Sequence, residues 1–533
     1  MLTNKLNSTP KNKTLIETTT VKSTGNVSPH SSPVKGQIHT GLTLFLATLV
    51  VVGLLSALLY FSSRRETSKN SELMVYVAAG MKPPFKAALD RYQKEFPVAF
   101  RPIYSGSGKL LSQIRASKRG DIYIAADSTY TDEARRLGLV DEVIPLASIR
   151  PVIAVARGNP KGIRTVDDLV RSDVKLALAN ANVASVGRVS KKFLTKAGKW
   201  DAISAAVKVE KPTVTDVAND VKIGTVDAAI IWDVTANQYP EIETIESPIF
   251  KDAEQHVTLG ILRTCTDPAG ALRFGRYLGA PEKGLQEFKR FNYGTVDGDP
   301  WEERPKILLF SGGVNRLAIK ETIREFEARE GVDIIPVYNG CGILVSAMKS
   351  GEIPDAYFAC DTSFVNDVQD HFHAGVTIST TDMVIIVQKG NPRGIQSLKD
   401  LGKKGLKVGV ANAKQSALGE LTQRLLKRKG LQDAVNSNVV VQTPTADLLV
   451  NQIRAGPATL DAAVVYRANT PKAAKALDII DINEPDAQAL QPFVQSKESR
   501  FPRLVSRLRA AFTSALSRER FEKNGFSWLV EGK

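Results

Sequence analysis

The chain has 533 residues and, with 71 Lys and Arg against 56 Asp and Glu, a formal net charge of +15. Its 43% of hydrophobic and 24% of charged residues are typical of a globular protein and exclude wholesale disorder or a collagen-like fibre. With 3 cysteines and 5 histidines it is neither a disulfide scaffold nor a four-cysteine zinc module, and a histidine-rich metal enzyme is disfavoured. The basic residues form no dense run, so nucleic-acid binding is not indicated.

The N-terminal part of the chain predicts a membrane anchor. Residues 1–36 are rich in Ser, Thr, Asn and Lys, so we expect a disordered tail. From Gly41 to Phe61 the chain holds 21 residues without a charge, which matches the ~20 that a helix needs to span a bilayer. Because about 40 polar residues precede this stretch, it differs from a cleavable signal peptide. We predict an uncleaved, single transmembrane helix at 37–62 and a polar linker at 63–72.

The rest of the chain is a duplication. The segment VARGNPKGIRTVDDL of the first copy corresponds to VQKGNPRGIQSLKDL in the second, and TVDAAIIWDVTAN corresponds to TLDAAVVYRANTP. Further matches occur in the same order along both copies, which is strong evidence for two copies of one fold. We therefore expect two units, at 73–300 and 301–533.

Within each copy, apolar strands alternate with amphipathic helices. The first elements expected are strands at Leu73–Val77, Ala99–Tyr104 and Ile122–Ala125 and helices at Pro83–Glu95 and Lys109–Ser117. This alternation predicts an α/β fold built from parallel βαβ units. In such sheets ligands bind beyond the carboxyl ends of the strands, where loops lead into helices.

Four such loops recur in both copies and are rich in small and hydroxyl-bearing residues. In the first copy they are Ala78–Met81, Tyr104–Gly108, Ala125–Ser128 and Asn182–Gly187. Glycine and serine at helix starts leave backbone N–H groups free, and the helix dipole adds positive potential there. That combination suits a small oxyanion without any lysine or arginine in the pocket. The alternative is that these residues only form turns and cap helices.

The loops of the second copy differ in their side chains. Ser311-Gly312-Gly313 replaces Ala78-Ala79-Gly80, and Asn339-Gly340-Cys341-Gly342 replaces the Ser-Gly-Ser-Gly loop. Trp232-Asp233 becomes Tyr466-Arg467. We therefore expect the two sites to differ in ligand preference.

Two of the cysteines, Cys341 and Cys360, fall in loops at the same strand ends of the second copy. In an exported domain they could form a disulfide, stay as buried thiols or ligate a soft metal. Cys265 has no partner in the first copy.

At these residues the chain resembles the periplasmic molybdate-binding proteins of ABC importers, within the wider family of sulfate-, molybdate- and iron-binding proteins. The most specific pieces are Gly158-Asn159-Pro160 and Gly390-Asn391-Pro392, the Ser-Gly-Ser-Gly loop and the DAAIIW and DAAVVY segments. The resemblance implies periplasmic-binding-protein-like units of two α/β lobes, joined by crossing strands. An anion would be held in the cleft between the lobes, without an enzymatic step.

The family holds molybdate with serine hydroxyls, backbone N–H groups and a tyrosine near the last strand of the second lobe. Gly80 stands where the family commonly has its first serine, and Trp232 stands where the tyrosine is expected. The residues that the loops and this resemblance together select in the first unit are Ala79, Gly80, Ser105, Gly106, Ser107, Asp127, Ser185, Val186 and Trp232.

In the second unit Tyr466 matches the tyrosine of the family, but Gly313 lacks the first hydroxyl and Cys341 replaces a serine. These departures bear on the ligand more than on the fold. The candidate ligand-binding residues of the second unit are Gly312, Gly313, Asn339, Gly340, Cys341, Asp361, Ala417 and Tyr466.

We therefore predict a membrane-anchored tandem solute-binding protein whose units lie on the extracytoplasmic side. Its partners would be a small oxyanion, such as molybdate or tungstate, and an ABC permease with its ATPase. No catalytic residue, metal, cofactor or nucleic acid is predicted. Within the same class, a binder of sulfate, phosphate or a metal ion stays open, since Asp127, Asp233 and Asp361 would suit a cation. A sensor or scaffold is the alternative from another class.

Overall fold

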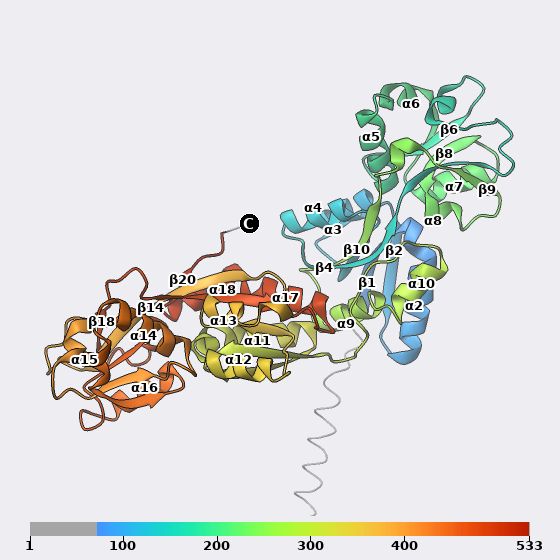
Figure 1. Cartoon of the computed structure of the whole chain (residues 1–533). Coiled ribbons are helices and arrows are strands. Elements are labelled where there is room, and N and C mark those ends of the chain that lie inside the picture. Colours follow the sequence, from blue (N-terminus) through green and yellow to red (C-terminus); the bar gives the residue numbers. More distant parts are fainter. Residues whose placement is uncertain (1–71, 532–533) are drawn as a thin grey trace, which may run out of the picture. The chain divides into compact units, whose positions relative to one another are not determined.

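The computed structural model describes residues 72–531, coloured along the chain in Figure 1. The predicted tail, the span at 37–62 and the linker up to residue 71 lie outside the described residues. None of the helices in 72–531 combines the length and the apolar character of a membrane span.

The first unit has two lobes, each built on one five-stranded sheet. In the first lobe the strand order is β2-β1-β3-β10-β4. Strand β1 is parallel to both β2 and β3, whereas β10 is antiparallel to its neighbours β3 and β4. The strands of this sheet are β1 (Leu73–Ala78), β2 (Phe100–Ser105), β3 (Ile122–Ala125), β4 (Val140–Ile149) and β10 (Gln255–Leu262). Its helices are α2 (Lys82–Glu95), α3 (Ser107–Ser117), α4 (Ser128–Arg136), α9 (Pro268–Leu278) and α10 (Gly284–Arg290).

The second lobe of the first unit repeats this plan with the order β7-β6-β8-β5-β9. Its strands are β5 (Pro151–Ala156), β6 (Leu176–Ala179), β7 (Val207–Lys211), β8 (Ala228–Trp232) and β9 (Ile242–Ile245). Its helices are α5 (Ser185–Lys196), α6 (Trp200–Ala206), α7 (Val214–Lys222) and α8 (Asp233–Ala236). Both β6 and β8 are buried along their whole length, as expected for the central strands of a sheet covered on both faces.

The chain crosses between the two lobes twice, at the sites where a hinge is expected. One crossing is Arg150, which separates β4 from β5, and the other runs from β9 to β10 through a short 3-10 helix, Pro248–Phe250. The first lobe is thus assembled from two segments that are far apart in sequence, whereas the second lobe is one continuous segment inserted between them. Two crossings of this kind permit closure about a hinge.

The second unit has the same two lobes with a more continuous sheet, in the order β12-β11-β13-β19-β14-β17-β15-β16. The long strand β14 (Val376–Gln388) pairs with β19 in the first lobe and with β17 and β18 in the second. The other strands are β11 (Lys306–Gly312), β12 (Asp333–Asn339), β13 (Ala356–Phe358), β15 (Val408–Ala411), β16 (Val439–Thr443), β17 (Ala462–Tyr466), β18 (Leu477–Asp481), β19 (Gln488–Gln495) and β20 (Ser527–Trp528).

The helices of the second unit follow those of the first in order. They are α11 (Arg316–Glu330), α12 (Cys341–Lys349), α13 (Thr362–Asn366), α14 (Ala417–Arg428), α15 (Gln432–Asn436), α16 (Ala446–Arg454), α17 (Pro502–Phe512) and α18 (Ala515–Lys523). The duplication read from the sequence is therefore a duplication of an α/β two-lobed unit.

The predicted elements of the first unit agree with the structure to within two residues. The strand at Ile122–Ala125 has the predicted bounds, and the helix that follows the Ser-Gly-Ser-Gly loop begins at Ser107 instead of Lys109. The sheet is mixed and not purely parallel, because the strands that cross between lobes enter it antiparallel to their neighbours.

Candidate functional site

A small cavity of about 20 Å³ lies between the two lobes of the first unit. It is lined by Ala78, Ala79, Gly80, Ser105, Gly106, Ser107, Ala126, Ala184, Ser185, Val186, Thr213, Val214 and Trp232. This lining includes every residue of the first unit that was predicted to bind a ligand, except Asp127. None of the lining residues is charged, so a guest would be held by dipoles and hydroxyl groups.

The start of α3 forms one wall of the cavity. The N-cap residue of this helix is Gly106, and no side chain caps it. The hydroxyl oxygen of Ser107 accepts a hydrogen bond from Ala126 N at 3.2 Å, while Tyr123 donates to the Ser107 carbonyl at 2.8 Å. Because a hydroxyl that accepts this bond keeps its own proton, Ser107 can donate into the cavity.

The start of α5 forms the facing wall. Its N-cap residue, Ala184, has no side chain that could cap the helix, and the first helical bond runs from Arg188 N to Ala184 O at 3.1 Å. The amides that precede this bond, from Ser185 to Gly187, are the free donors of a helix start. The buried hydroxyl of Ser185 also has no hydrogen-bond partner among the described residues. An orphaned buried hydroxyl costs about 1–3 kcal/mol, so this wall favours a guest that accepts hydrogen bonds.

Gly80 lines the cavity, and its carbonyl accepts a hydrogen bond from Tyr293 Oη at 2.6 Å. A Cβ at this position would lie 3.1 Å from Val214 Cγ1 and 3.4 Å from Thr235 Oγ1. The hydroxyl of Thr235 is buried and has no partner in the part of the chain that the structure describes. A side chain at position 80 would therefore lie next to the Thr235 hydroxyl of the opposite lobe.

Sequence reasoning missed the two cavity residues at the start of α7. Thr213 caps that helix by accepting a hydrogen bond from Asp216 N at 3.1 Å, and Val214 is its first residue. The pattern Pro-Thr-Val-Thr-Asp at 212–216 is a helix start that could have identified this loop.

Asp127 is the predicted residue that does not line the cavity. It is the N-cap of α4, where its carboxylate accepts a hydrogen bond from Thr129 N at 2.8 Å. Its counterpart Asp361 caps α13 in the same way, through Ser363 N at 3.0 Å. Both carboxylates are therefore engaged in helix capping.

The lobes of the first unit are held together across the cavity. Gly108 N and Lys109 N donate to the carbonyl of Val183 in the other lobe, at 3.0 and 3.3 Å. Arg188, on α5, donates to Thr129 Oγ1 at 2.5 Å, and its guanidinium carbon lies 3.4 Å from the ring centre of Tyr130 on α4. These contacts join the lobes in a closed arrangement.

The register of the strands corrects one equivalence between the units. Ala78 pairs with Ser105, and Gly312 pairs with Asn339, so Gly312 corresponds to Ala78 and not to Ala79. The predicted alignment of this loop was therefore wrong by one residue, and Val314 is the counterpart of Gly80. The error arose because small residues in a loop give no periodic pattern that fixes an alignment.

The predicted residues of the second unit gather at the corresponding strand ends. Asn339 turns its side chain onto the loop, where Oδ1 accepts a hydrogen bond from Gly340 N at 2.9 Å. Gly342 N donates to Gln415 O of the other lobe at 3.1 Å, so this cleft is also closed. Ala417 is buried at the start of α14. The hydroxyl of Tyr466 is buried and has no partner among residues 72–531, and burial raises its pKa well above the ordinary value.

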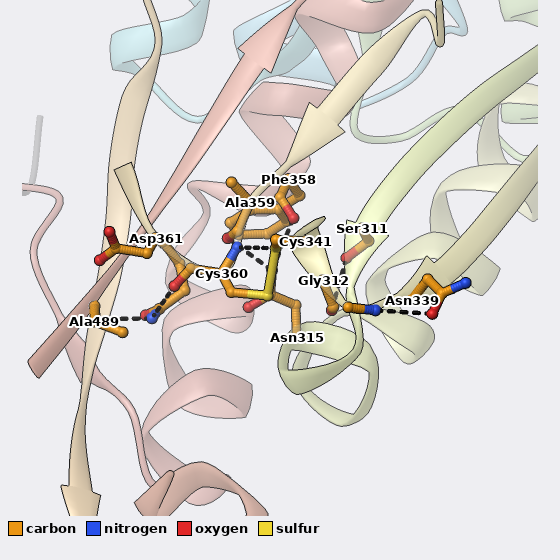
Figure 2. The surroundings of a disulfide bond; sticks show 12 residues. Ser311, Gly312, Asn315, Asn339, Cys341, Phe358, Ala359, Cys360, Asp361 and Ala489 are labelled. Atoms are coloured by element: carbon orange, nitrogen blue, oxygen red, sulfur yellow. Dashed lines mark hydrogen bonds between the residues drawn. A yellow bond between two sulfur atoms is a disulfide. The ribbon is translucent and has the colours of Figure 1, made fainter. Parts of the chain in front are cut away.

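Cys341 and Cys360 form a disulfide in this cleft, with their Cα atoms 6.4 Å apart (Figure 2). Cys341 is the first residue of α12, and Cys360 follows β13. The amide of Asn315 supports the end of β13 by donating to Phe358 O at 3.1 Å and to Ala359 O at 3.2 Å. Of the three states that the sequence left open for Cys341 and Cys360, the structure therefore has the disulfide. Cys265 is a free thiol, and burial raises its pKa to about 12.

Comparison with known proteins assigns this fold and cleft to a family. The family model of the bacterial extracellular solute-binding proteins matches residues 73–290 and again residues 307–527. The chain therefore belongs to this family and carries its domain twice, which confirms the assignment predicted from the sequence. It is a family of binding proteins.

Two curated relatives each match about one unit of the chain. A putative binding protein of Haemophilus influenzae is 24% identical over 223 residues, which are 41% of this chain and 89% of that protein. The molybdate-binding protein ModA of Mycobacterium bovis is 25% identical over 205 residues, which are 38% of this chain and 77% of that protein.

Among solved structures, the fold is similar to that of the periplasmic molybdate-binding protein of Azotobacter vinelandii, with 16% identity and a TM-score of 0.38. That match covers 42% of this chain and 100% of the other. The substrate-binding domain of a putative molybdenum ABC transporter from Clostridium difficile matches with 20% identity and a TM-score of 0.34, over 42% of this chain and 99% of the other.

Proposed function

We propose that the first unit captures a small, fully ionised tetrahedral oxyanion of the molybdate or tungstate type. The observation that carries this proposal is the cavity between the lobes, where the starts of α3 and α5 have no side-chain cap and no charged residue lines the wall. The hydroxyl groups of Ser105, Ser107 and Ser185 converge there, while Val183 O takes two of the amides of α3 and the Thr213 hydroxyl donates to Asp216. Free N–H groups and helix dipoles stabilise an anion without a counter-charge.

The chemistry of the lining also favours some oxyanions over others. Phosphate at neutral pH carries a proton that needs an acceptor, and a carboxylate would be the strongest one. Asp127, which follows the lining residue Ala126, is engaged as a helix cap. Molybdate, tungstate and sulfate carry no proton at neutral pH and can use every donor of the cavity.

The wider role proposed is that of an anchored extracytoplasmic component of an ABC importer, which hands the anion to a permease and its ATPase. The relatives named as molybdate-binding proteins support this role, and the apolar stretch at 37–62 supports the single-pass anchor. Closure of the lobes about Arg150 would trap the anion before delivery.

The experiment is a calorimetric titration of the purified chain with molybdate, tungstate, sulfate and phosphate. We expect saturable binding of molybdate or tungstate, weaker binding of sulfate and none of phosphate. Ser107→Asp should abolish this binding, because like charges about 4 Å apart repel by about 4 kcal/mol at an effective dielectric constant of 20, or roughly 1,000-fold in affinity. Ser112→Asp, at an exposed position of the same helix, is the control.

Two results would count against the proposal. If no oxyanion gives heat, the first unit is not an anion-binding unit. If Ser107→Asp binds as tightly as Ser112→Asp, the anion is held somewhere other than the cavity at α3.

A further inference from the structure

The second cleft repeats one local arrangement of the first with different chemistry. Strand register places Cys341 at the position of Ser107 and Cys360 at the position of Ala126. The backbone hydrogen bond is kept, since Cys360 N donates to Cys341 Sγ at 3.0 Å where Ala126 N donates to the Ser107 hydroxyl at 3.2 Å. The loop geometry is therefore the same in both units, and only the group at its centre differs.

The disulfide removes the donor that the first unit has at this position. Ser107 accepts one hydrogen bond and still has a proton to donate, whereas a disulfide sulfur has none. The sulfur atoms also take up space, because a Cβ added to Gly312 would overlap Cys360 Sγ and lie 3.2 Å from Cys341 Sγ. Gly312 corresponds to Ala78, which lines the cavity of the first unit. Figure 2 shows the disulfide between the strand ends that carry Gly312 and Asp361.

A reversal of charge accompanies the disulfide. The sequences Ser-Val-Gly-Arg and Ala-Leu-Gly-Glu open α5 and α14, so Glu420 occupies the position of Arg188. Where Arg188 pairs with Asp127 at 3.8 Å, Glu420 lies across the cleft from Ser363, whose hydroxyl is 3.5 Å away. Burial is the main cause of the raised pKa of Tyr466, and the nearby carboxylates of Asp361 and Glu420 add to it. Glu420 also pairs with Arg424 of its own helix at 3.3 Å.

The start of α16 keeps the number of carboxylates that the start of α7 has. Thr445 and Asp447 take the places of Thr213 and Thr215 of the first unit, and Leu448 takes the place of Asp216. Asp447 Oδ1 lies 4.0 Å from the position of a Cβ on Gly313. The second cleft has thus lost one hydroxyl donor, that of Ser107, and has the carboxylate of Glu420 in place of the guanidinium of Arg188. A dianion buried there would have one donor fewer than in the first cleft and would meet a like charge in place of a cation, which is unfavourable.

We propose that the second unit excludes oxyanions, and that the Cys341–Cys360 disulfide and Glu420 are the residues that set this specificity. The tandem chain then captures one anion per molecule, in the first unit. This inference rests on the function proposed for the first unit.

The test counts molybdate equivalents bound by the full chain. The oxidised protein, checked by one free thiol per denatured chain, should bind one equivalent, and Ser107→Asp should bind none. The triple variant Cys341→Ser/Cys360→Ala/Glu420→Arg rebuilds the serine, alanine and arginine of the first unit, and we expect it to bind two equivalents. The control triple variant Cys341→Ser/Cys360→Ala/Glu519→Arg makes the same charge change at an exposed residue of α18 and should bind one.

Four results would overturn this inference without refuting oxyanion binding by the chain. They are two equivalents bound by the oxidised wild-type chain, one equivalent retained by Ser107→Asp, one equivalent bound by the rebuilt triple variant, and two equivalents bound by the control triple variant. The wild-type and Ser107→Asp measurements need no change in the second unit, so they decide the exclusion even if the triple variant fails to fold. Absence of binding by every chain would instead refute the function proposed for the first unit.

Discussion

Asp233 and Arg467 occupy the same position in the two units, directly after the last residue of β8 and of β17, and they carry opposite charges. Each forms an ion pair with the residue at the crossing between lobes, Asp233 with Arg150 at 3.8 Å and Arg467 with Asp382 at 3.4 Å. The charges of the hinge pair are therefore exchanged between the units, while the pairing across the hinge is kept. An exchange of this kind indicates that the contact itself matters at the crossing.

The exchanged pair predicts a coupling that can be measured. Asp233→Arg places two arginines together and removes the bond that Val234 N donates to the Asp233 carboxylate at 2.8 Å, so we expect a loss of about 1–2 kcal/mol in unfolding free energy. Arg150→Asp should cost about 1 kcal/mol, because it leaves Asp233 and Glu246 next to a third carboxylate. The double variant should recover part of the loss, as measured by urea unfolding.

Arg101→Asp, on the exposed edge strand β2, is the control for the change of charge. Strictly additive effects of Asp233→Arg and Arg150→Asp would show that the two side chains do not interact across the hinge.

The contacts of Arg188 predict that it stabilises the closed first unit. Arg188→Ala removes a bond to Thr129 and a stacked contact on Tyr130, both across the cleft. We expect roughly a tenfold loss of molybdate affinity, since a cation–π contact alone is worth about 0.5–2 kcal/mol. Small-angle scattering should show a larger radius of gyration without ligand. Arg136→Ala, at an exposed position of α4, is the control, and equal affinities of the two variants would contradict this role.

The close approach of the lobes predicts that Gly106 tolerates no side chain. A Cβ at this position would overlap Val183 O and lie 2.7 Å from Pro212 O, and both carbonyls belong to the other lobe. Since backbone atoms cannot move aside, Gly106→Ala should hold the first unit open and abolish anion binding while each lobe stays folded. Scattering and calorimetry on the same sample check this expectation. Ala116→Ser, at the exposed end of α3, should behave as wild type, and binding by Gly106→Ala would refute the steric argument.

Asp400 predicts a dependence of stability on pH in the second unit. The ion pair with Lys403 and hydrogen bonds from the amide of Gln396 and the side chain of Ser397 lower the pKa of its carboxyl to about 2. Because the pKa is lower in the folded state than the value of about 3.9 in unfolded chains, the stabilisation is present above pH ~4 and is lost as the pH falls towards 2.

Asp400→Asn should therefore lower the unfolding free energy at pH 7 by about 1 kcal/mol, after allowance for solvent screening, and by only a small part of that at pH 2. Urea titrations at both pH values measure this difference. Asp433→Asn, which neutralises an exposed carboxyl in α15, is the control. A loss for Asp400→Asn that is the same at both pH values would assign the effect to packing and not to ionisation.

Some of the candidate site could be read directly from the sequence because its groups are local. Helix starts rich in glycine and serine present backbone donors wherever they occur, so Gly106, Ser107 and Ser185 could be selected before their neighbours were known. Thr213 was missed because its loop lacks the glycine that marks the other loops and has the pattern of an ordinary helix cap. The role of Asp127 as a helix cap likewise depends on the exact start of α4.

The sequence by itself determined that the chain contains two copies of one α/β unit, because each copy repeats the same order of strands, helices and loops. It also determined which loops carry free donors, since the dipole of a helix start is a property of the backbone. Only the tertiary structure decided that Cys341 and Cys360 pair, because parallel strands β11, β12 and β13 bring the two loops together. It alone placed Arg188 beside Thr129 and Glu420 beside Ser363 across the two clefts, because such contacts depend on how two lobes close on each other.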